Sequence, residues 1–165
     1  MNKVVIFGNR STAAVLLDYL HRDSEYKVKT FTVDSAYIQE STFLGLPLVP
    51  FDLVKSLYPP GEYQMMIGIG YTHMNKLKAE RFNQAKEMGY QLINYISPRS
   101  SIWSGFVVNE NVRIHDATIR NKVTIARSSL IGAGAVILED TVENGVYKTH
   151  PAELLPILSN QIHLE

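Results

Sequence analysis

Aliphatic residues return at almost every sixth position in the C-terminal half of the chain. The positions that carry this repeat are Ile102, Val108, Ile114, Ile119, Ile125, Ile131 and Ile137. A second small or apolar residue stands two positions before most of them, which suits a short strand in each unit, whereas an amphipathic helix places apolar residues three and four apart. The pattern predicts a parallel β-helix with three faces and a shared apolar axis. A set of short strands in a sandwich is the alternative.

The repeat is short for a structure of this kind. Three six-residue units make a coil of about eighteen residues, so residues 102–137 supply about two coils. A solenoid generally needs three or more repeats to bury a continuous core, and a shorter prism leaves apolar surface exposed. We therefore expect a homotrimer, in which each subunit covers an outer face of its neighbour.

The N-terminal half instead alternates apolar runs with amphipathic ones. Strands are expected at residues 4–7, 28–33, 43–49, 64–69 and 92–96, and helices at 13–20, 52–57 and 74–89. This alternation is typical of a doubly wound parallel sheet. The period changes between Ser97 and Ser101, so we expect an α/β, Rossmann-like domain over residues 1–97 and a β-helix with a C-terminal tail over residues 98–165.

Composition narrows the range of partners. The 16 lysine and arginine residues balance the 16 acidic ones, so we expect neither a nucleic acid nor a membrane surface as a partner. The chain has no cysteine, hence no disulfide framework and no thiolate metal site. The apolar run after Lys3 is too short for a secretion signal. We expect a cytoplasmic protein without a metal.

Three strand ends carry candidate ligand contacts, because ligands bind beyond the carboxyl ends of strands in open α/β sheets. These ends are Gly8-Asn9-Arg10-Ser11, Asp34, and Gly68-Ile69-Gly70-Tyr71. A glycine turn opening into a helix suits a phosphate, and an acid after the second strand suits a ribose or base. The first turn has one glycine rather than the three of the dinucleotide fingerprint, which favours a nucleotide-sugar. The alternative is that the glycines form only tight turns and that Asp34 only caps a helix.

Taken together, several segments resemble the sugar acyltransferases related to sialic acid O-acetyltransferases, and most of all the N-acetyltransferases of nucleotide-linked amino-dideoxy sugars. The segments are residues 5–9, 31–34, 67–71 with 74–75, 94–97, 131–137 and 144–147. The resemblance implies a left-handed β-helix, a homotrimer, acetyl-CoA as the donor and a nucleotide-sugar on the N-terminal domain. The residues expected to bind the nucleotide-sugar are Gly8, Asn9, Arg10, Ser11, Asp34, Gly70, Tyr71 and Asn75.

The general base is harder to assign. Members of the family carry it in a segment rich in Gly-His-His, which this chain lacks, and the one five-residue spacing, from Ile114 to Ile119, looks like the place where coils are absent. Acyl transfer to an amine needs a neutral nitrogen, an oxyanion donor and a base. His115 is the only histidine inside the repeat and is therefore the candidate base. A turn residue facing solvent is the alternative.

The donor site is expected near the end of the repeat. Small residues at Gly132, Ala133 and Gly134 would let a pantetheine arm lie against the backbone, although tight prism corners explain them equally well. Family members carry Gly-x-Pro-Ala after the last coil, whereas this chain has Thr149 in place of the glycine. Lys148 is the candidate partner for a coenzyme A phosphate. The sequence thus predicts an acetyl-CoA-dependent N-acetyltransferase with a shortened β-helix; a nucleotide-sugar-binding protein without catalysis and a trimeric scaffold are the alternatives.

Overall fold

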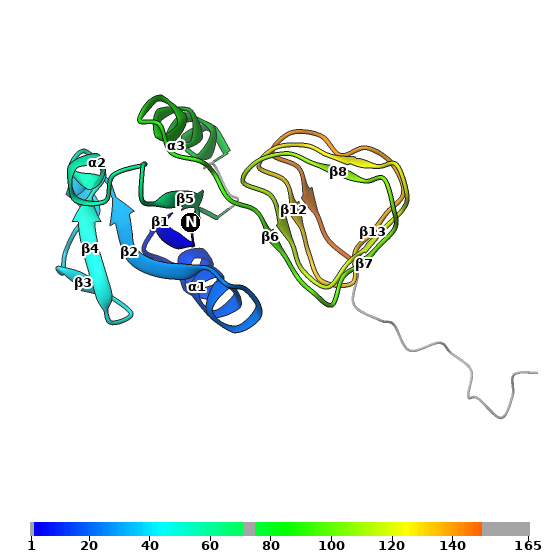
Figure 1. Cartoon of the computed structure of the whole chain (residues 1–165), viewed down its shortest axis with the longest axis horizontal. Helices are drawn as coiled ribbons and strands as arrows, with labels where there is room; N and C mark the ends of the chain where they lie inside the picture. The colour runs from blue at the N-terminus through cyan, green and yellow to red at the C-terminus, as the bar shows by residue number, and fades with distance from the viewer. Residues whose placement is uncertain (1, 71–74, 150–165) are drawn as a thin grey trace, which may run out of the picture.

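A computed structural model describes residues 2–70 and 75–149 of the chain. Two units lie side by side in it, a sheet flanked by helices and a triangular coil of short strands (Figure 1). In the described part of the chain, no helix is long and apolar enough to cross a membrane, and no three His, Cys, Asp or Glu side chains are grouped to hold a metal ion.

The first unit is built on a five-stranded sheet with the order β3-β4-β2-β1-β5. Its strands are β1 (Lys3–Phe7), β2 (Lys27–Val33), β3 (Thr42–Phe43), β4 (Leu46–Pro50) and β5 (Gln64–Ile67). All neighbours pair in parallel except β3 with β4, which are antiparallel. β1 is apolar on both sides, as the all-apolar run Val4–Phe7 predicts for a strand buried on both faces.

Helices cover the two faces of this sheet. They are α1 (Ser11–Asp23), α2 (Val54–Leu57) and α3 (Asn75–Glu87), with a short 3-10 turn, η1, at Ser35–Tyr37. On one face Leu16 and Leu20 of α1 share a core with Val4 and Ile6. On the other face Phe82 of α3 packs with the alternate residues of β1, and Val54 of α2 joins the same cluster. The alternation of side chains along β1 thus decides which helix each residue meets.

The second unit is a parallel β-helix with three faces. The first face consists of β6 (Tyr95–Ile96), β9 (Arg113–Ile114), β12 (Leu130–Ile131) and β14 (Val146–Tyr147); the second of β7 (Ser101–Ile102), β10 (Thr118–Ile119) and β13 (Val136–Ile137); the third of β8 (Val107–Val108) and β11 (Thr124–Ile125). Ile96, Ile114 and Ile131 stand in register. The isoleucines and valines of the repeat form the core, as expected.

Two expectations about the β-helix are corrected by this arrangement. Residues 95–96 were expected as a strand of the first unit, yet β6 pairs with β9 and opens the first coil. With β14 added at the other end, the coils extend beyond the two that residues 102–137 provide. The division of the chain at residues 97 and 98 stays a prediction. Tyr95 also packs into the core beside α1, so its side chain contributes to both units.

The five-residue spacing marks a tighter corner. Between β9 and β10 the chain turns at Asp116, whose φ is 41°. β9 pairs with strands of the coils before and after it, and β10 does the same. The stack therefore continues through this corner without a gap, and the absence of coils here relative to members of the family stays a prediction. Other corners turn at residues with similarly positive φ: Gly105, Asn111, Lys122, Ser128, Gly134 and Asn144.

Polar contacts tie the two units together. The Asn111 side-chain oxygen accepts a hydrogen bond of 2.9 Å from the Ile67 amide at the end of β5. Lys78 of α3, only 3% exposed, donates to the Ser128 carbonyl at 2.6 Å. Arg99, in the first coil, forms ion pairs with Asp23 of α1 and with Asp116. The orientation of α1 and α3 against the β-helix corners is thus held by specific donors and acceptors.

Candidate functional site

The turn between β1 and α1 lines a cavity of about 250 Å³, which we call the strand-end cavity. Its lining residues are Phe7, Gly8, Asn9, Arg10, Ser11, Thr12, Val33, Asp34, Tyr37, Gly68, Ile69, Gly70 and Leu77. Six of the residues expected to bind a nucleotide-sugar are therefore brought together; Tyr71 and the Asn75 side chain lie outside the described part. Their role in binding stays a prediction.

Gly8 is required by the close approach of β1 and β5. Its φ is 133°, and a Cβ built there would lie 2.7 Å from the Gly68 carbonyl oxygen. Its amide already donates to the Thr32 carbonyl at 2.8 Å, so this N–H is used within the sheet. The helix begins at Ser11, with Arg10 at the N-cap position, two residues before the expected start at residue 13. The first turn of α1 accordingly forms one wall of the cavity.

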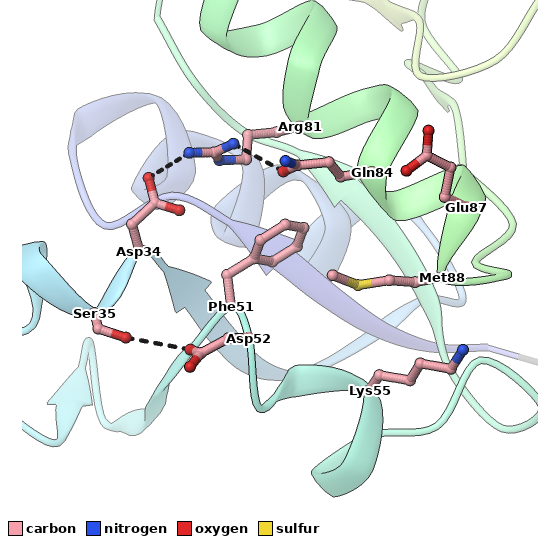
Figure 2. Close-up of a pocket in the computed structure, with 9 residues that line it drawn as sticks. All are labelled: Asp34, Ser35, Phe51, Asp52, Lys55, Arg81, Gln84, Glu87 and Met88. Atoms are coloured by element: carbon pink, nitrogen blue, oxygen red, sulfur yellow. Dashed lines mark hydrogen bonds and ion pairs between the residues drawn. The ribbon is translucent and has the colours of Figure 1, made fainter.

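Asp34 lies where expected, after β2, but it has a partner that sequence reasoning missed. Its carboxylate forms an ion pair of 2.8 Å with Arg81 of α3 (Figure 2). It makes no side-chain cap hydrogen bond to η1, so the interpretation of Asp34 as a cap alone is wrong. Burial opposes the charge of Arg81, but hydrogen bonds to Asp34 and Glu80 outweigh it and raise the pKa of Arg81.

Asp34 also lines a second cavity of about 540 Å³, which we call the α3-side cavity. Figure 2 shows its lining residues: Asp34, Ser35, Phe51, Asp52, Lys55, Arg81, Gln84, Glu87 and Met88. The guanidinium of Arg81 lies 5.9 Å from the ring centroids of both Phe51 and Phe7. One signal in the sequence could have pointed to this cavity. Phe51 and Asp52 directly follow β4, so they lie at the same edge of the sheet as Asp34.

His115 lies in the corner after β9 and faces α1. Its ring centroid is 4.7 Å from that of Tyr19 and 5.3 Å from that of Tyr95. The ring is therefore partly buried between two aromatic side chains, unlike a turn residue that faces open solvent. Burial, aided by the charge of Arg113, lowers the pKa of His115 to about 4. Its Nδ1 is buried and has no hydrogen-bond partner among the residues described.

A third cavity, of about 210 Å³, separates α1 from the β-helix, and we call it the α1–β-helix cavity. It is lined by Ser11, Thr12, Val15, Leu16, Arg113, His115 and Leu130. Ser11 and Thr12 line both this cavity and the strand-end cavity. The first turn of α1 therefore adjoins the expected nucleotide site on one side and the candidate base on the other.

The candidate donor residues share a corner with His115. The His115 amide donates to the Ile131 carbonyl. The Gly134 amide donates to the backbone carbonyl of Asp116, and the Gly132 amide to the backbone carbonyl of Tyr147. Because these bonds join successive coils at the corner between the first and second faces, the expected base and donor segment are stacked upon one another. Sequence spacing alone could not reveal this stacking, because the two segments come together only when the chain coils.

The glycines at this corner have a structural explanation. A Cβ at Gly134 would lie 3.2 Å from Cγ2 of Thr149, and one at Gly132 would lie 3.2 Å from the Tyr147 carbonyl oxygen. Both amides are also engaged between coils, so they are not open donors for a pantetheine arm or an oxyanion. Ala133 and Lys148 are exposed at the same corner. Binding of coenzyme A by these residues stays a prediction.

The fold is that of known sugar acetyltransferases. Comparison of the sequence with protein-family models and with curated proteins finds no match. Among solved structures, PerB from Caulobacter crescentus, in complex with CoA and GDP-perosamine, has a TM-score of 0.69 at 24% identity over 83% of this chain. The acetyltransferase domain of PglB from Neisseria gonorrhoeae, in complex with acetyl coenzyme A, has a TM-score of 0.55 at 13% identity over 82% of this chain.

The chain is shorter than these proteins. It spans 63% of the PerB chain and 60% of the PglB chain in that complex. A variant of perosamine N-acetyltransferase from Caulobacter crescentus, also with CoA and GDP-perosamine, matches at a TM-score of 0.70 and 24% identity. At these identities the likeness establishes the fold.

Proposed function

We propose that this chain is an N-acyltransferase that moves the acetyl group of acetyl-CoA to the amine of a nucleotide-linked amino sugar. The observation that carries the proposal is that Ser11 and Thr12 line both the strand-end cavity and the α1–β-helix cavity. The strand-end cavity suits a nucleotide diphosphate at the start of α1, and the neighbouring cavity ends at His115. The fold shared with acetyltransferases whose structures hold CoA and GDP-perosamine supports the same class of reaction.

The chemistry needs few groups. The lone pair of the amine attacks the thioester carbonyl carbon, a C–N bond forms, the C–S bond breaks, and coenzyme A leaves as a thiolate. The proton lost by nitrogen passes to His115 and from it to the thiolate, which leaves as the thiol. At neutral pH His115 is unprotonated and so can accept this proton.

The proposed assembly is a homotrimer with a left-handed β-helix, and the sheet unit is a Rossmann-like nucleotide-binding domain. Large apolar side chains stay exposed on the second and third faces of the β-helix: Trp103, Val107, Val136, Leu138 and Val142. An exposed apolar patch of this kind favours contact with further subunits. Because acetyl-CoA and nucleotide-sugars are cytoplasmic metabolites, the proposal implies a cytoplasmic enzyme.

Calorimetry and a thiol assay test the function. We expect acetyl-CoA and one member of a panel of UDP-, dTDP- and GDP-linked amino sugars to bind. Transfer then releases coenzyme A thiol, which a thiol reagent detects without background because the chain contains no cysteine. Binding of neither co-substrate contradicts the proposal.

A nucleotide-sugar-binding protein without catalysis is the second candidate, and one observation favours it. A base whose pKa lies near 4 has little driving force to take a proton at neutral pH, since efficient general bases have pKa values near the working pH. Binding of the nucleotide-sugar without binding of acetyl-CoA and without thiol release identifies this alternative.

A further inference from the structure

The described residues offer no hydrogen bond that would orient the ring of His115 through its buried nitrogen. A catalytic histidine is usually held in this way, by donating from its second ring nitrogen to a carboxylate or a backbone carbonyl. In His115 the Nδ1 atom is buried and has no such partner in the part of the chain that the structure describes. The neighbouring acid, Asp116, instead accepts hydrogen bonds from Ser97 and Arg99. The imidazole must therefore be fixed by contacts of another kind.

Two tyrosine rings contact the imidazole. The Tyr19 centroid lies 4.7 Å from that of His115 at an interplanar angle of 43°, and the Tyr95 centroid lies 5.3 Å away at an angle of 38°. The two tyrosines also contact each other, with their centroids 5.1 Å apart. Rings from α1, from β6 and from the corner after β9 thus form one cluster, and close packing restricts the rotation of the imidazole within it.

The two tyrosines differ in how firmly they are held. Tyr95 is 2% exposed, and its hydroxyl donates to the Asp23 carboxylate at 3.1 Å. Asp23 in turn forms an ion pair of 3.2 Å with Arg99. Tyr19 is only half-buried and lies on the outward part of α1. Tyr19 can therefore be replaced with less disturbance to the junction of the two units than Tyr95.

Tyr19 also connects this cluster to the start of α1. Residues four apart share one face of a helix, so Ser11, Val15 and Tyr19 lie in one row. Ser11 and Val15 line the α1–β-helix cavity together with His115, and Ser11 lines the strand-end cavity as well. A rise of about 1.5 Å per residue places Tyr19 about 12 Å along the axis from Ser11. One helix therefore spans from the expected nucleotide cavity to the candidate base.

We propose that Tyr19 is a positioning residue of the transferase, whose ring fixes the orientation of the His115 imidazole and shields it from water, in place of the carboxylate that usually orients a catalytic histidine. This inference rests on the proposed function. Through Tyr19, the helix that begins at the strand-end cavity also sets the place of the base.

Steady-state kinetics with thiol detection tests this role on the amino sugar that binds among the UDP-, dTDP- and GDP-linked panel. Tyr19→Leu should lower kcat by about tenfold to a hundredfold, because a misplaced catalytic group can cost that much. The KM for the nucleotide-sugar should stay within about twofold, as for a group that acts only in the transition state. Tyr19→Phe, which keeps the ring, should restore kcat. Tyr19→Met removes the ring but fills irregular space, and it replaces Tyr19→Leu should that variant not fold.

The pKa of His115 gives a readout that loss of packing elsewhere does not change. Besides the two tyrosines, the charged groups nearest the imidazole are Arg113 on β9, Asp116 in the corner and Asp23 of α1, and both acids are paired with Arg99. Burial is the main cause of the low pKa of His115, so removal of a covering ring should raise this pKa from about 4 towards 6.5.

An NMR titration of the imidazole signals measures this change, and His115→Gln identifies the signal among the five histidines. Tyr63→Leu, which breaks a ring contact of 5.2 Å with Tyr58 inside the sheet unit, is the control and should leave the pKa of His115 near 4. If the wild type releases no thiol, the proposed function fails and the catalytic role of Tyr19 with it. If the wild type is active but the ring-removing variant matches Tyr63→Leu in kcat or in the pKa of His115, only the positioning role is overturned.

Discussion

At the residue scale, surroundings decide what each candidate side chain can do. Asp34 is held by Arg81, so any ribose or base must share or displace that partner. His115 is held between Tyr19 and Tyr95, where desolvation keeps its imidazole neutral. Both residues lie on cavities, yet neither is the freely solvated group that residue type alone suggests.

Replacement of His115 tests its role as the base. His115→Ala should lower kcat by roughly 10²–10⁴ and leave nucleotide-sugar affinity nearly unchanged, because a positioned base acts only in the transition state. Steady-state kinetics with thiol detection measures this effect, and His21→Ala, at an exposed position on α1, is the control. A loss of less than about tenfold means that His115 is not the base.

The pH dependence of stability offers a second test of this histidine. The folded pKa is about 4 and the unfolded value 6.5, so between these pH values the unfolded chain binds more protons. The free energy of unfolding should therefore fall as pH drops from 6.5 towards 4. His115→Gln should flatten this slope in urea titrations, and an unchanged slope would show that burial does not shift this pKa.

Asp34 should contribute directly to ligand affinity. Asp34→Ala should weaken nucleotide-sugar binding by about 1–3 kcal/mol, both because a polar ligand group loses its partner and because Arg81 is left without its carboxylate. Calorimetry measures the loss, with Glu87→Ala, an exposed acid on the α3-side cavity, as the control. Equal affinity of Asp34→Ala and wild type rules out a role in binding.

At the element scale, α3 and the β-helix corners depend on one another. Lys78 spans this junction by donating to the Ser128 carbonyl, and Asn111 links the end of β5 to the Ser128 hydroxyl. Ser128 adopts a φ of 56°, which makes its carbonyl available at the corner. An amine with little water contact is costly to keep charged, so this contact should depend on pH.

Lys78→Met should reveal that cost. The folded pKa of Lys78 is about 7 and the unfolded value 10.5, so the wild type loses stability as pH falls from 10.5 to 7. Lys78→Met removes this pH dependence, although it also loses one hydrogen bond. Its free energy of unfolding, relative to that of the wild type, should therefore rise by about 2–4 kcal/mol when the pH is lowered from 10 to 7. Denaturant unfolding at both pH values measures this difference; Lys76→Met, exposed on the same helix, should show none.

At the scale of the whole molecule, the first face of the β-helix lies towards the sheet unit (Figure 1). Large apolar side chains on the other two faces are more than half exposed. Trp103 and Leu138 are more than half exposed, at corners that follow strands of the second face. The β-helix has more than two coils. It is therefore longer than the repeat in residues 102–137 suggests, and its shortness is a weaker reason to expect a trimer. The exposed apolar surface now carries the argument for assembly.

Leu138→Arg should weaken assembly. We expect a trimer mass by light scattering for the wild type at micromolar concentration and at least a tenfold weaker association for the variant, because a charge must be desolvated in the contact. Leu57→Arg, at a similarly exposed apolar position on α2, should remain trimeric. A monomeric wild type contradicts the assembly.

The sequence by itself determined the two types of repeat and most of the elements. Period six with inward isoleucines predicts the β-helix core, and apolar strands alternating with helices predict the parallel sheet, because burial on a pleated or coiled surface imposes these periods directly. The strand-end turn Gly8–Ser11 and Asp34 were also found in this way, since parallel strands end at a common edge.

Only the tertiary structure decided which groups meet across long separations. In the structure β6 pairs with β9 of the β-helix, and Arg81 forms an ion pair with Asp34. Lys78 donates a hydrogen bond to the Ser128 carbonyl, and Arg113 is buried beside His115. No local pattern predicts the first three of these contacts, because each joins residues at least 18 positions apart. Arg113 and His115 are near neighbours in the sequence, but their burial depends on packing against α1. Packing against α1 and α3 sets their desolvation, and desolvation sets the charge that each of these groups carries.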